Sequence, residues 1–286
     1  MSDNITEARI RQYSSTIEHL AQQMHTRFRD KVRVDTAIKG KMSLYNQIGA
    51  VELEDKISRH QKTPSMDVPH LRRALFCRKR HAGVLVDEED LTDIMTDPTS
   101  DYGAALSKGS GRKQDSVILE AMFGTAKTGE EGDVTVSLPP SQKETTVAGI
   151  TQAKIMFAKK TLDGNEVDEL IPRYAALSSE QFDELLTIPQ VINSDFNTIN
   201  ALVKGEINTW VGFEWCRSER LPYASGTIRQ CPFWAKDGVL LGVKGDTRVR
   251  VGERQDLSYD GQVYVDINIG ATRLQETHVV EVQCTE

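Results

Sequence analysis

The sequence contains few of the residues from which disulfide frameworks and zinc sites are built. Only four of its 286 residues are cysteines, namely Cys77, Cys216, Cys231 and Cys284. They are widely spaced, with no Cys-X-X-Cys pair and no neighbouring pair of histidines. Structural zinc requires closely spaced ligands, and disulfide frameworks occur mainly in small secreted chains. We therefore expect reduced thiols, a cytoplasm-like compartment of synthesis, and no metal or other cofactor.

Long apolar runs and a general excess of positive charge are also missing. The longest apolar run, near Val239–Val243, is far shorter than the ~20 residues that span a bilayer. Residues 1–7 are polar and acidic, unlike the start of a signal peptide. The net charge of −7 excludes a surface built throughout to coat nucleic acid. We expect no membrane partner, and any binding of phosphate groups has to be local.

Catalytic signatures are missing as well. The sequence has no Gly-X-X-X-X-Gly-Lys-[Ser/Thr] loop, no His-Glu-X-X-His motif and no Gly-X-Ser-X-Gly turn. The four consecutive acids Asp87, Glu88, Glu89 and Asp90 are a candidate Mg²⁺ site, although such a run more often forms a solvated or partner-facing patch. We predict that the chain is not an enzyme. An enzyme that uses these acids stays an alternative, because nucleophile and base meet only in the fold.

What the sequence does contain is a sharp segregation of charge between residues 56 and 97. The part that ends at His81 carries eight bases and the single acid Asp67, and the consecutive acids follow it. Extended runs at 47–57 and 71–86 predict a long hairpin with a broad tip. Its candidate basic face consists of Arg59, Lys62, Arg72, Arg73, Arg78, Lys79 and Arg80.

This hairpin needs a surface on which to lie, because an isolated two-stranded hairpin is marginally stable in water. Its like charges also repel one another unless acids or phosphates meet them. One candidate surface is an acidic patch on a neighbouring copy, such as the 87–90 acids. A second is nucleic acid, bound by a module built on the basic 56–81 hairpin. A third interpretation is a solvated ribbon folded back on its own domain.

The N-terminal segment repeats apolar residues at alternating spacings of three and four. This spacing predicts an amphipathic helix with one apolar stripe. Such a helix either packs on its own domain or docks on a partner as an arm. The stripe consists of Ile10, Tyr13, Ile17, Leu20, Met24 and Phe28.

The rest of the chain alternates helical and extended patterns, which predicts a compact α+β protein. A helix is expected to start at Asp97–Pro98 and to be weakened at Gly109–Gly111. Ser178 and Gln181 match a capping box, and Ser194 is a candidate cap of a further helix. Further expected elements are a helix at 150–162, a buried strand at 174–177, and strands at 210–216, 239–243, 247–251, 263–269 and 278–284.

Several segments resemble a known family in their order and spacing. They are Asp67–Arg73, Asp87–Asp90, Asp97–Tyr102, Asp115–Ala126 and Pro189–Pro222, the last of which includes Trp-Val-Gly-Phe-Glu-Trp. Together they are similar to the major capsid protein of tailed bacteriophages, which has the Hong Kong 97-type coat fold. The resemblance covers nearly the whole chain.

The resemblance implies an N-arm at 1–46, an extended E-loop at 47–90, a peripheral domain with a long spine helix at 91–148 and 239–286, and an axial domain at 149–238. It implies subunits that assemble as pentamers and hexamers into an icosahedral head around double-stranded DNA. A separate scaffolding protein, a portal, assembly in the host bacterial cytoplasm and a final place in the virion follow from the same resemblance. Gly109–Gly111 departs from a continuous spine helix, and no motif assigns a lysine–asparagine cross-link.

Overall fold

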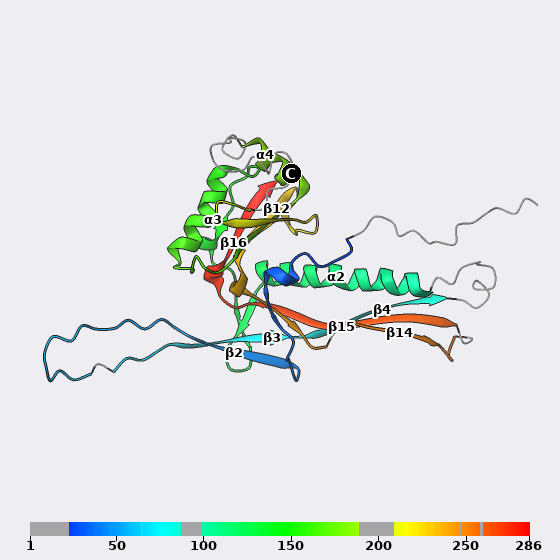
Figure 1. Cartoon of the computed structure of the whole chain (residues 1–286), viewed down its shortest axis with the longest axis horizontal. Coiled ribbons are helices and arrows are strands. Elements are labelled where there is room, and N and C mark those ends of the chain that lie inside the picture. Colours follow the sequence, from blue (N-terminus) through cyan, green and yellow to red (C-terminus); the bar gives the residue numbers. More distant parts are fainter. Residues whose placement is uncertain (1–22, 64, 87–98, 189–208, 246, 258–259) are drawn as a thin grey trace, which may run out of the picture. The chain divides into compact units, whose positions relative to one another are not determined.

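The computed structural model describes residues 23–286 except for 64, 87–98, 189–208, 246 and 258–259 (Figure 1). Within these residues the helices are α2 (Thr99–Phe123), α3 (Gln152–Gly164) and α4 (Ser179–Thr187), with short 3-10 turns at Arg29–Lys31, Pro140–Gln142, Lys236–Gly238 and Glu276–His278. The strands are β1 (Arg33–Asp35), β2 (Met42–Ile48), β3 (His70–Phe76), β4 (Arg78–Val86), β5 (Ala126–Thr128), β6 (Val134–Val136), β7 (Lys143–Glu144), β8 (Arg173–Leu177), β9 (Thr209–Trp210), β10 (Phe213–Arg217), β11 (Tyr223–Ser225), β12 (Ile228–Ala235), β13 (Val239–Val243), β14 (Arg248–Glu253), β15 (Gly261–Arg273) and β16 (Val279–Thr285). The predicted α+β class is confirmed. Among the described helices, none combines the length and the apolar character that crossing a bilayer requires.

The chain divides into two compact units, which are described separately. The described part of the first unit comprises residues 23–25, 80–112 and 247–267, with gaps at 87–98 and 258–259. The described part of the second unit comprises 26–79, 113–245 and 268–286, with gaps at 64 and 189–208. Three of the boundaries fall inside β4, α2 and β15.

In the first unit, α2 packs on a sheet that contains β4, β15 and β14. β14 runs antiparallel to β15, from Arg248 opposite Asp266 to Glu253 opposite Gly261, and β4 also pairs with β15. A side chain at Gly103 of α2 would meet valines of β14 and β15, so the helix lies close against this face. Every second residue of β15 from 263 to 269 is buried, as the alternating sequence predicts.

The predicted interruption of α2 at Gly109–Gly111 is wrong. The helix is continuous over its 25 residues. Each glycine costs a helix about 1 kcal/mol relative to alanine. The last turns of α2, however, bury Val117, Ile118, Leu119 and Met122 almost completely. Burial of an apolar face contributes more to helix stability than local propensity does.

The second unit contains a mixed sheet with the order β7-β16-β12-β8-β10-β9. β8 is parallel to β10 and antiparallel to β12, and all five of its residues are buried. An aromatic cluster fills the core, with the rings of Phe213 and Phe233 5.2 Å apart and edge to face. Helices α3 and α4 lie beside this sheet (Figure 1). The predicted capping box at Ser178 and Gln181 is confirmed at the start of α4.

One predicted strand, 210–216, is two strands separated by a turn. β9 ends at Trp210 and β10 begins at Phe213, and the two run antiparallel. Val211 and Gly212 between them both have positive φ, at 55° and 82°. A β-branched residue rarely adopts this conformation, so the sequence gives little warning of the turn.

A separate sheet of the second unit has the order β2-β3-β5-β6 and supports the predicted hairpin. β2 pairs with β3 from Met42 opposite Phe76 to Ile48 opposite His70. The amide of Gly49 donates to the Pro69 carbonyl at 2.9 Å, where the ladder ends. The predicted strand at 47–57 is therefore wrong, because the strand ends at Ile48. The predicted run at 71–86 is split into β3 and β4.

The N-terminal helix is wrong in the part that can be compared. Ile10, Tyr13, Ile17 and Leu20 lie outside the described residues. Residues 23–28 are not helical; Met24 is 60% exposed whereas Phe28 is buried. The buried carboxylate of Asp115 accepts the backbone N–H groups of Arg27 and Phe28 at 3.1 and 3.3 Å. These two N–H groups are therefore not available for the hydrogen bonds of an N-terminal helix.

Candidate assembly surfaces

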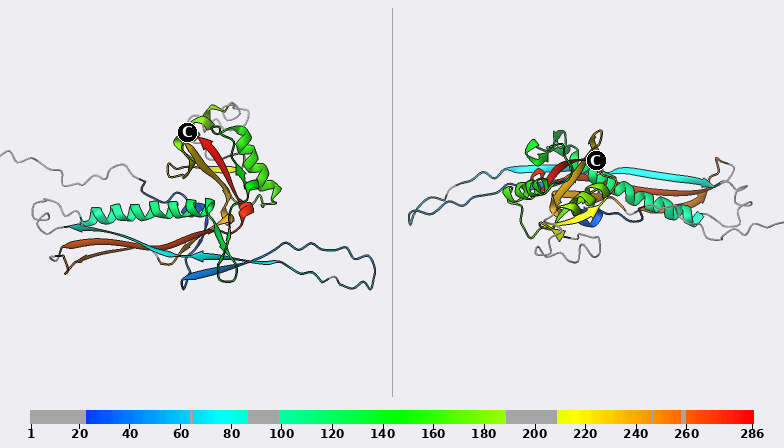
Figure 2. Two further views of the ribbon diagram at one scale, coloured as in Figure 1. Left: turned by 180° about the vertical axis from the view of Figure 1, so that it is seen from behind. Right: turned by 90° about the horizontal axis from the view of Figure 1, so that it is seen from above.

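The loop that joins β2 to β3, residues 49–69, extends away from the ends of these strands (Figures 1 and 2). All residues from 51 to 63 are exposed. Leu53 is 95% exposed and Ile57 is 89% exposed. Large apolar side chains left in water on a projecting segment indicate an interaction site.

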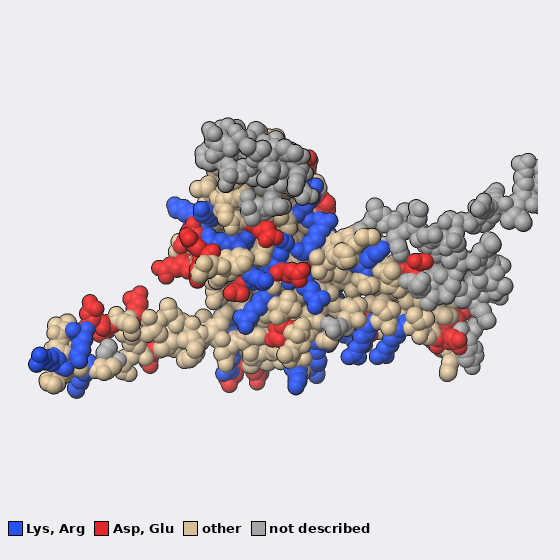
Figure 3. Space-filling model, viewed as in Figure 1, with Lys and Arg blue, Asp and Glu red and all other residues tan. Residues whose placement is uncertain are grey.

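The charge of this loop is mixed. Glu52, Glu54 and Asp55 precede the bases Lys56, Arg59 and Lys62, and Figure 3 shows acidic and basic side chains on the loop. Glu54, Asp55 and Lys62 line one shallow pocket at the tip. The predicted basic face therefore has acids beside it.

Arg73 does not belong to an exposed basic face, and this corrects the predicted set. It is 5% exposed; its Nε donates to the Leu274 carbonyl at 2.9 Å, and its Nη2 forms an ion pair with Glu276. Neighbouring strand residues point to opposite faces. Arg72 is accordingly exposed, and its Nε donates to Asn46 Oδ1 at 3.0 Å.

The remaining members of the predicted set are distributed over two elements. Arg59 and Lys62 are exposed in the loop. Arg78 and Lys79 are exposed at the start of β4, and Arg80 is half-buried. The predicted acidic partner patch, Asp87, Glu88, Glu89 and Asp90, lies outside the described residues.

Within the second unit, a buried charge cluster holds β3, the strand that follows the loop. The guanidinium of Arg273 donates to the carbonyls of Met122 and Gly124 at 2.8 and 2.7 Å, which caps the end of α2. Its Nε lies 3.8 Å from Glu276, which also pairs with Arg73. Burial lowers the pKa of Arg273. One carboxylate thus serves two arginines, one from β3 and one from β15.

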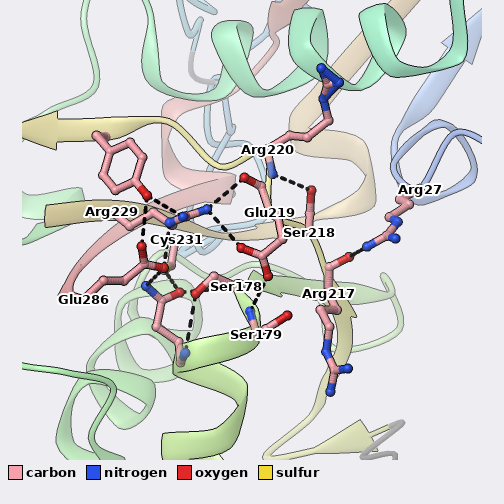
Figure 4. Close-up of polar contacts among 12 residues, drawn as sticks. Arg27, Ser178, Ser179, Arg217, Ser218, Glu219, Arg220, Arg229, Cys231 and Glu286 are labelled. Carbon is pink, nitrogen blue, oxygen red and sulfur yellow. Dashed lines mark hydrogen bonds and ion pairs between the residues drawn. The ribbon is translucent and has the colours of Figure 1, made fainter. Parts of the chain in front are cut away.

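A second polar cluster connects α4 with the strands after residue 217 (Figure 4). Arg229 is buried and lies over the ring of Tyr223; its Nε contacts Glu286 at 2.7 Å, and its Nη1 donates to the Glu219 carbonyl at 2.9 Å. The Ser179 amide donates to the Glu219 carboxylate. Hydrogen bonds from the Ser179 side chain and, to a smaller extent, from its backbone lower the pKa of Glu219.

Glu286 is ionised more readily than an ordinary glutamate. Burial opposes its ionisation, but hydrogen bonds from Ser178, Arg229 and Tyr223 lower its pKa. The predicted motif at 189–222 therefore contributes Glu219 to a structural network, while its part at 189–208 lies outside the described residues. Sequence patterns did not indicate this network, because its members lie far apart in the chain; Gln181 and Glu286, for example, are 105 positions apart.

Among the described residues, no group of three or more His, Cys, Asp or Glu residues is arranged to hold a metal ion. None of the four cysteines forms a disulfide bond within the described chain. Burial raises the pKa of Cys216 to about 12, so this thiol stays protonated at neutral pH.

This arrangement of an extended loop, a long helix and a compact α+β unit is the fold of tailed-phage capsid proteins. The capsid structure of cyanophage P-SCSP1u matches with a TM-score of 0.74 and 16% identity, over 99% of this chain and 96% of that chain. The cyanophage Pam1 capsid matches with a TM-score of 0.72 and 13% identity, over 98% and 97%. Mycobacterium phage Che8 matches with a TM-score of 0.69 and 17% identity, over 96% and 97%.

The sequence itself gives the family. The sequence model of the phage capsid protein family matches residues 5–286. The chain belongs to this family, and it is a structural protein of the phage head rather than an enzyme. No curated protein matches the chain.

Proposed function

We propose that this chain is the self-associating subunit of an icosahedral phage head, arranged as pentamers and hexamers around double-stranded DNA. Family membership supports this proposal, and so do the structural matches to phage capsids. The 49–69 loop carries the argument for self-association, because Leu53 and Ile57 are almost fully exposed. A segment with this composition gains by burial on a neighbouring copy.

The parts carry the roles expected for them in this proposal. Residues 1–46 form the N-arm, and 47–90 form the E-loop with its exposed bases as an inter-subunit contact. Residues 91–148 with 239–286 form the peripheral domain, and 149–238 form the axial domain. The continuous α2 is suited to the role of spine helix, since it spans 25 residues without a break.

The proposed partners beyond other copies are a scaffolding protein, a portal and the packaged DNA, with assembly in the host bacterial cytoplasm. Nothing favours the alternative of a nucleic-acid-binding module. Residues 49–69 contain four acids and three Lys or Arg residues, and Arg73 is buried in an internal ion pair. A loop with this balance attracts phosphates weakly.

The test is electron microscopy of the purified, concentrated protein, expressed alone and with the scaffolding protein of its phage. We expect closed shells, or rings of five and six subunits, in at least one of the two preparations. A strictly monodisperse monomer in both would refute the proposal. DNA binding that decreases steeply with salt, without any assembly, would instead support the nucleic-acid module.

A further inference from the structure

The outer edge of β14 is an open strand edge in the described part of the first unit. β14 is the end strand of its sheet, and among the described strands it pairs only with β15. All six of its residues are exposed. The backbone groups on such an edge are a template for another strand.

The two faces of β14 differ in chemistry. Val249 and Val251 share the face on which α2 packs, yet they remain 48% and 62% exposed. Arg248 and Arg250 alternate with them and therefore lie on the opposite face. A strand added here has to present apolar side chains on the helix side and acids on the other.

The segment Val51–Glu54 of the 49–69 loop has this pattern. Val51 and Leu53 alternate with Glu52 and Glu54. All four residues are exposed and belong to no strand of the described chain. Leu53 is 95% exposed, so it contacts almost nothing in its own chain.

We propose that Val51–Glu54 of one copy adds to β14 of a second copy as an antiparallel strand. Opposite residues in an antiparallel pair lie on the same face. The register that satisfies all four positions places Val51 opposite Val251, Glu52 opposite Arg250, Leu53 opposite Val249, and Glu54 opposite Arg248. This inference rests on the proposed function and names the surface that receives the loop.

Competing arrangements match less well. A parallel strand with Glu52 opposite Arg248 and Glu54 opposite Arg250 brings Asp55 opposite Val251. If two copies of β14 pair antiparallel with their valines on one face, Arg250 lies opposite either Arg250 or Arg248 of the other copy. Like charges directly opposite each other destabilise a sheet. The arginines thus disfavour self-pairing of β14 and favour an acidic partner.

A charge swap tests the register. Glu52→Arg and Arg250→Glu each place like charges opposite each other, and we expect each to lower the yield of sedimenting shells roughly tenfold, because the effect recurs at every copy. The double variant with both changes restores opposite charges and should return the yield to near wild type. The matched control, Glu52→Arg with Arg248→Glu, has the same net charge but the wrong register, and should assemble worse than either single variant.

The outcomes separate this inference from the proposed function. Equal yields for the two double variants would overturn the register, while wild-type shells in the same experiment would leave the proposed function intact. If the wild-type chain forms no assembly with its scaffolding protein, the proposed function fails first.

Cysteine trapping checks the same pairing in assembled shells. Leu53→Cys with Val249→Cys places two thiols opposite each other, within the reach of a disulfide. Oxidation with diamide should then produce a ladder of linked chains on a non-reducing gel. Leu53→Cys with Val251→Cys is the shifted control, and each single-cysteine variant controls for the native thiols. A ladder from the shifted pair alone, or links confined to single chains, would refute the proposal.

Discussion

Removing the carboxylate of Glu276 leaves two buried guanidinium groups without the acid that pairs with both. The side chains of Arg73, Arg273 and Glu276 are 6%, 0% and 16% exposed. Glu276→Gln keeps the size of the side chain and removes its charge. Breaking a buried ion pair by removing one partner costs about 3–5 kcal/mol. Arg273 keeps its bonds to the carbonyls at the end of α2, so we expect the lower end of this range, about 3 kcal/mol.

Thermal and urea unfolding of the dissociated subunit, followed by tryptophan fluorescence, measure this loss. For a chain of this size, about 3 kcal/mol corresponds to a decrease of roughly 6–12 °C in Tm. The matched control is Glu219→Gln, because Glu219 is 57% exposed in its ion pair with a buried arginine. We expect the control to cost under about 1 kcal/mol. A Glu276→Gln variant as stable as the control would refute the assigned role of the cluster.

Three further predictions concern the loop base, a close approach of strands, and acid stability. In urea titrations, Arg72→Glu should change the free energy of unfolding by less than ~0.5 kcal/mol, whereas Arg73→Glu should lower it by more than ~3 kcal/mol. Expression of Arg73→Glu should therefore yield little soluble subunit. Gly270→Ala should lower Tm strongly, since its Cβ would lie 2.1 Å from a backbone oxygen of β3, whereas Gly164→Ala, with nothing within 4 Å, should not. The pKa of Glu286 is lowered from 4.5 although burial opposes this, so its stabilisation is complete above about pH 4.5 and is lost as pH falls through its folded pKa. Urea midpoints measured from pH 7 to pH 3 should therefore decrease less for Glu286→Gln than for the wild type.

Elements with a strong local signal could be predicted from the sequence. The strict alternation at 263–269 and the apolar run at 239–243 correspond to β15 and β13. The capping box at 178–181 fixes the start of α4. In each case the residues that determine the element lie within or next to it, so the information is contained in a short window.

Strand β12 was missed, because Pro232 lies in its middle and prolines are rare inside sheets. The strand tolerates Pro232 because this residue pairs with a neighbouring strand on one side only. Pro232 is opposite Glu281 of β16, while pairing with β8 begins only at Phe233 and pairing with β11 ends at Arg229. Whether the side of β12 away from β16 is unpaired at Pro232 depends on where β8 and β11 end. A sequence window does not contain that information.

The candidate site was predicted in part for the same reason. The exposed loop and its bases at Arg59 and Lys62 follow from local composition. The inward orientation of Arg73 depends on Glu276, which lies 203 positions away. The exposed face is therefore less basic than the stretch from 56 to 81 suggests, because Arg73 is buried and Glu52 and Glu54 lie just before that stretch.

The energetics of the proposed strand addition predict that it forms only in assemblies. Burial of Leu53 contributes about 1.5–3 kcal/mol, and burial of the exposed parts of Val51, Val249 and Val251 brings the total to roughly 4–7 kcal/mol. Fixing four backbone residues costs about 1–2 kcal/mol each, or roughly 4–8 kcal/mol. A single contact is thus close to neutral, and many contacts in a closed shell make it stable. The Leu53→Cys, Val249→Cys variant should therefore show no intermolecular disulfide as a dilute subunit and a complete ladder in shells. Equal linking in both preparations would contradict this estimate.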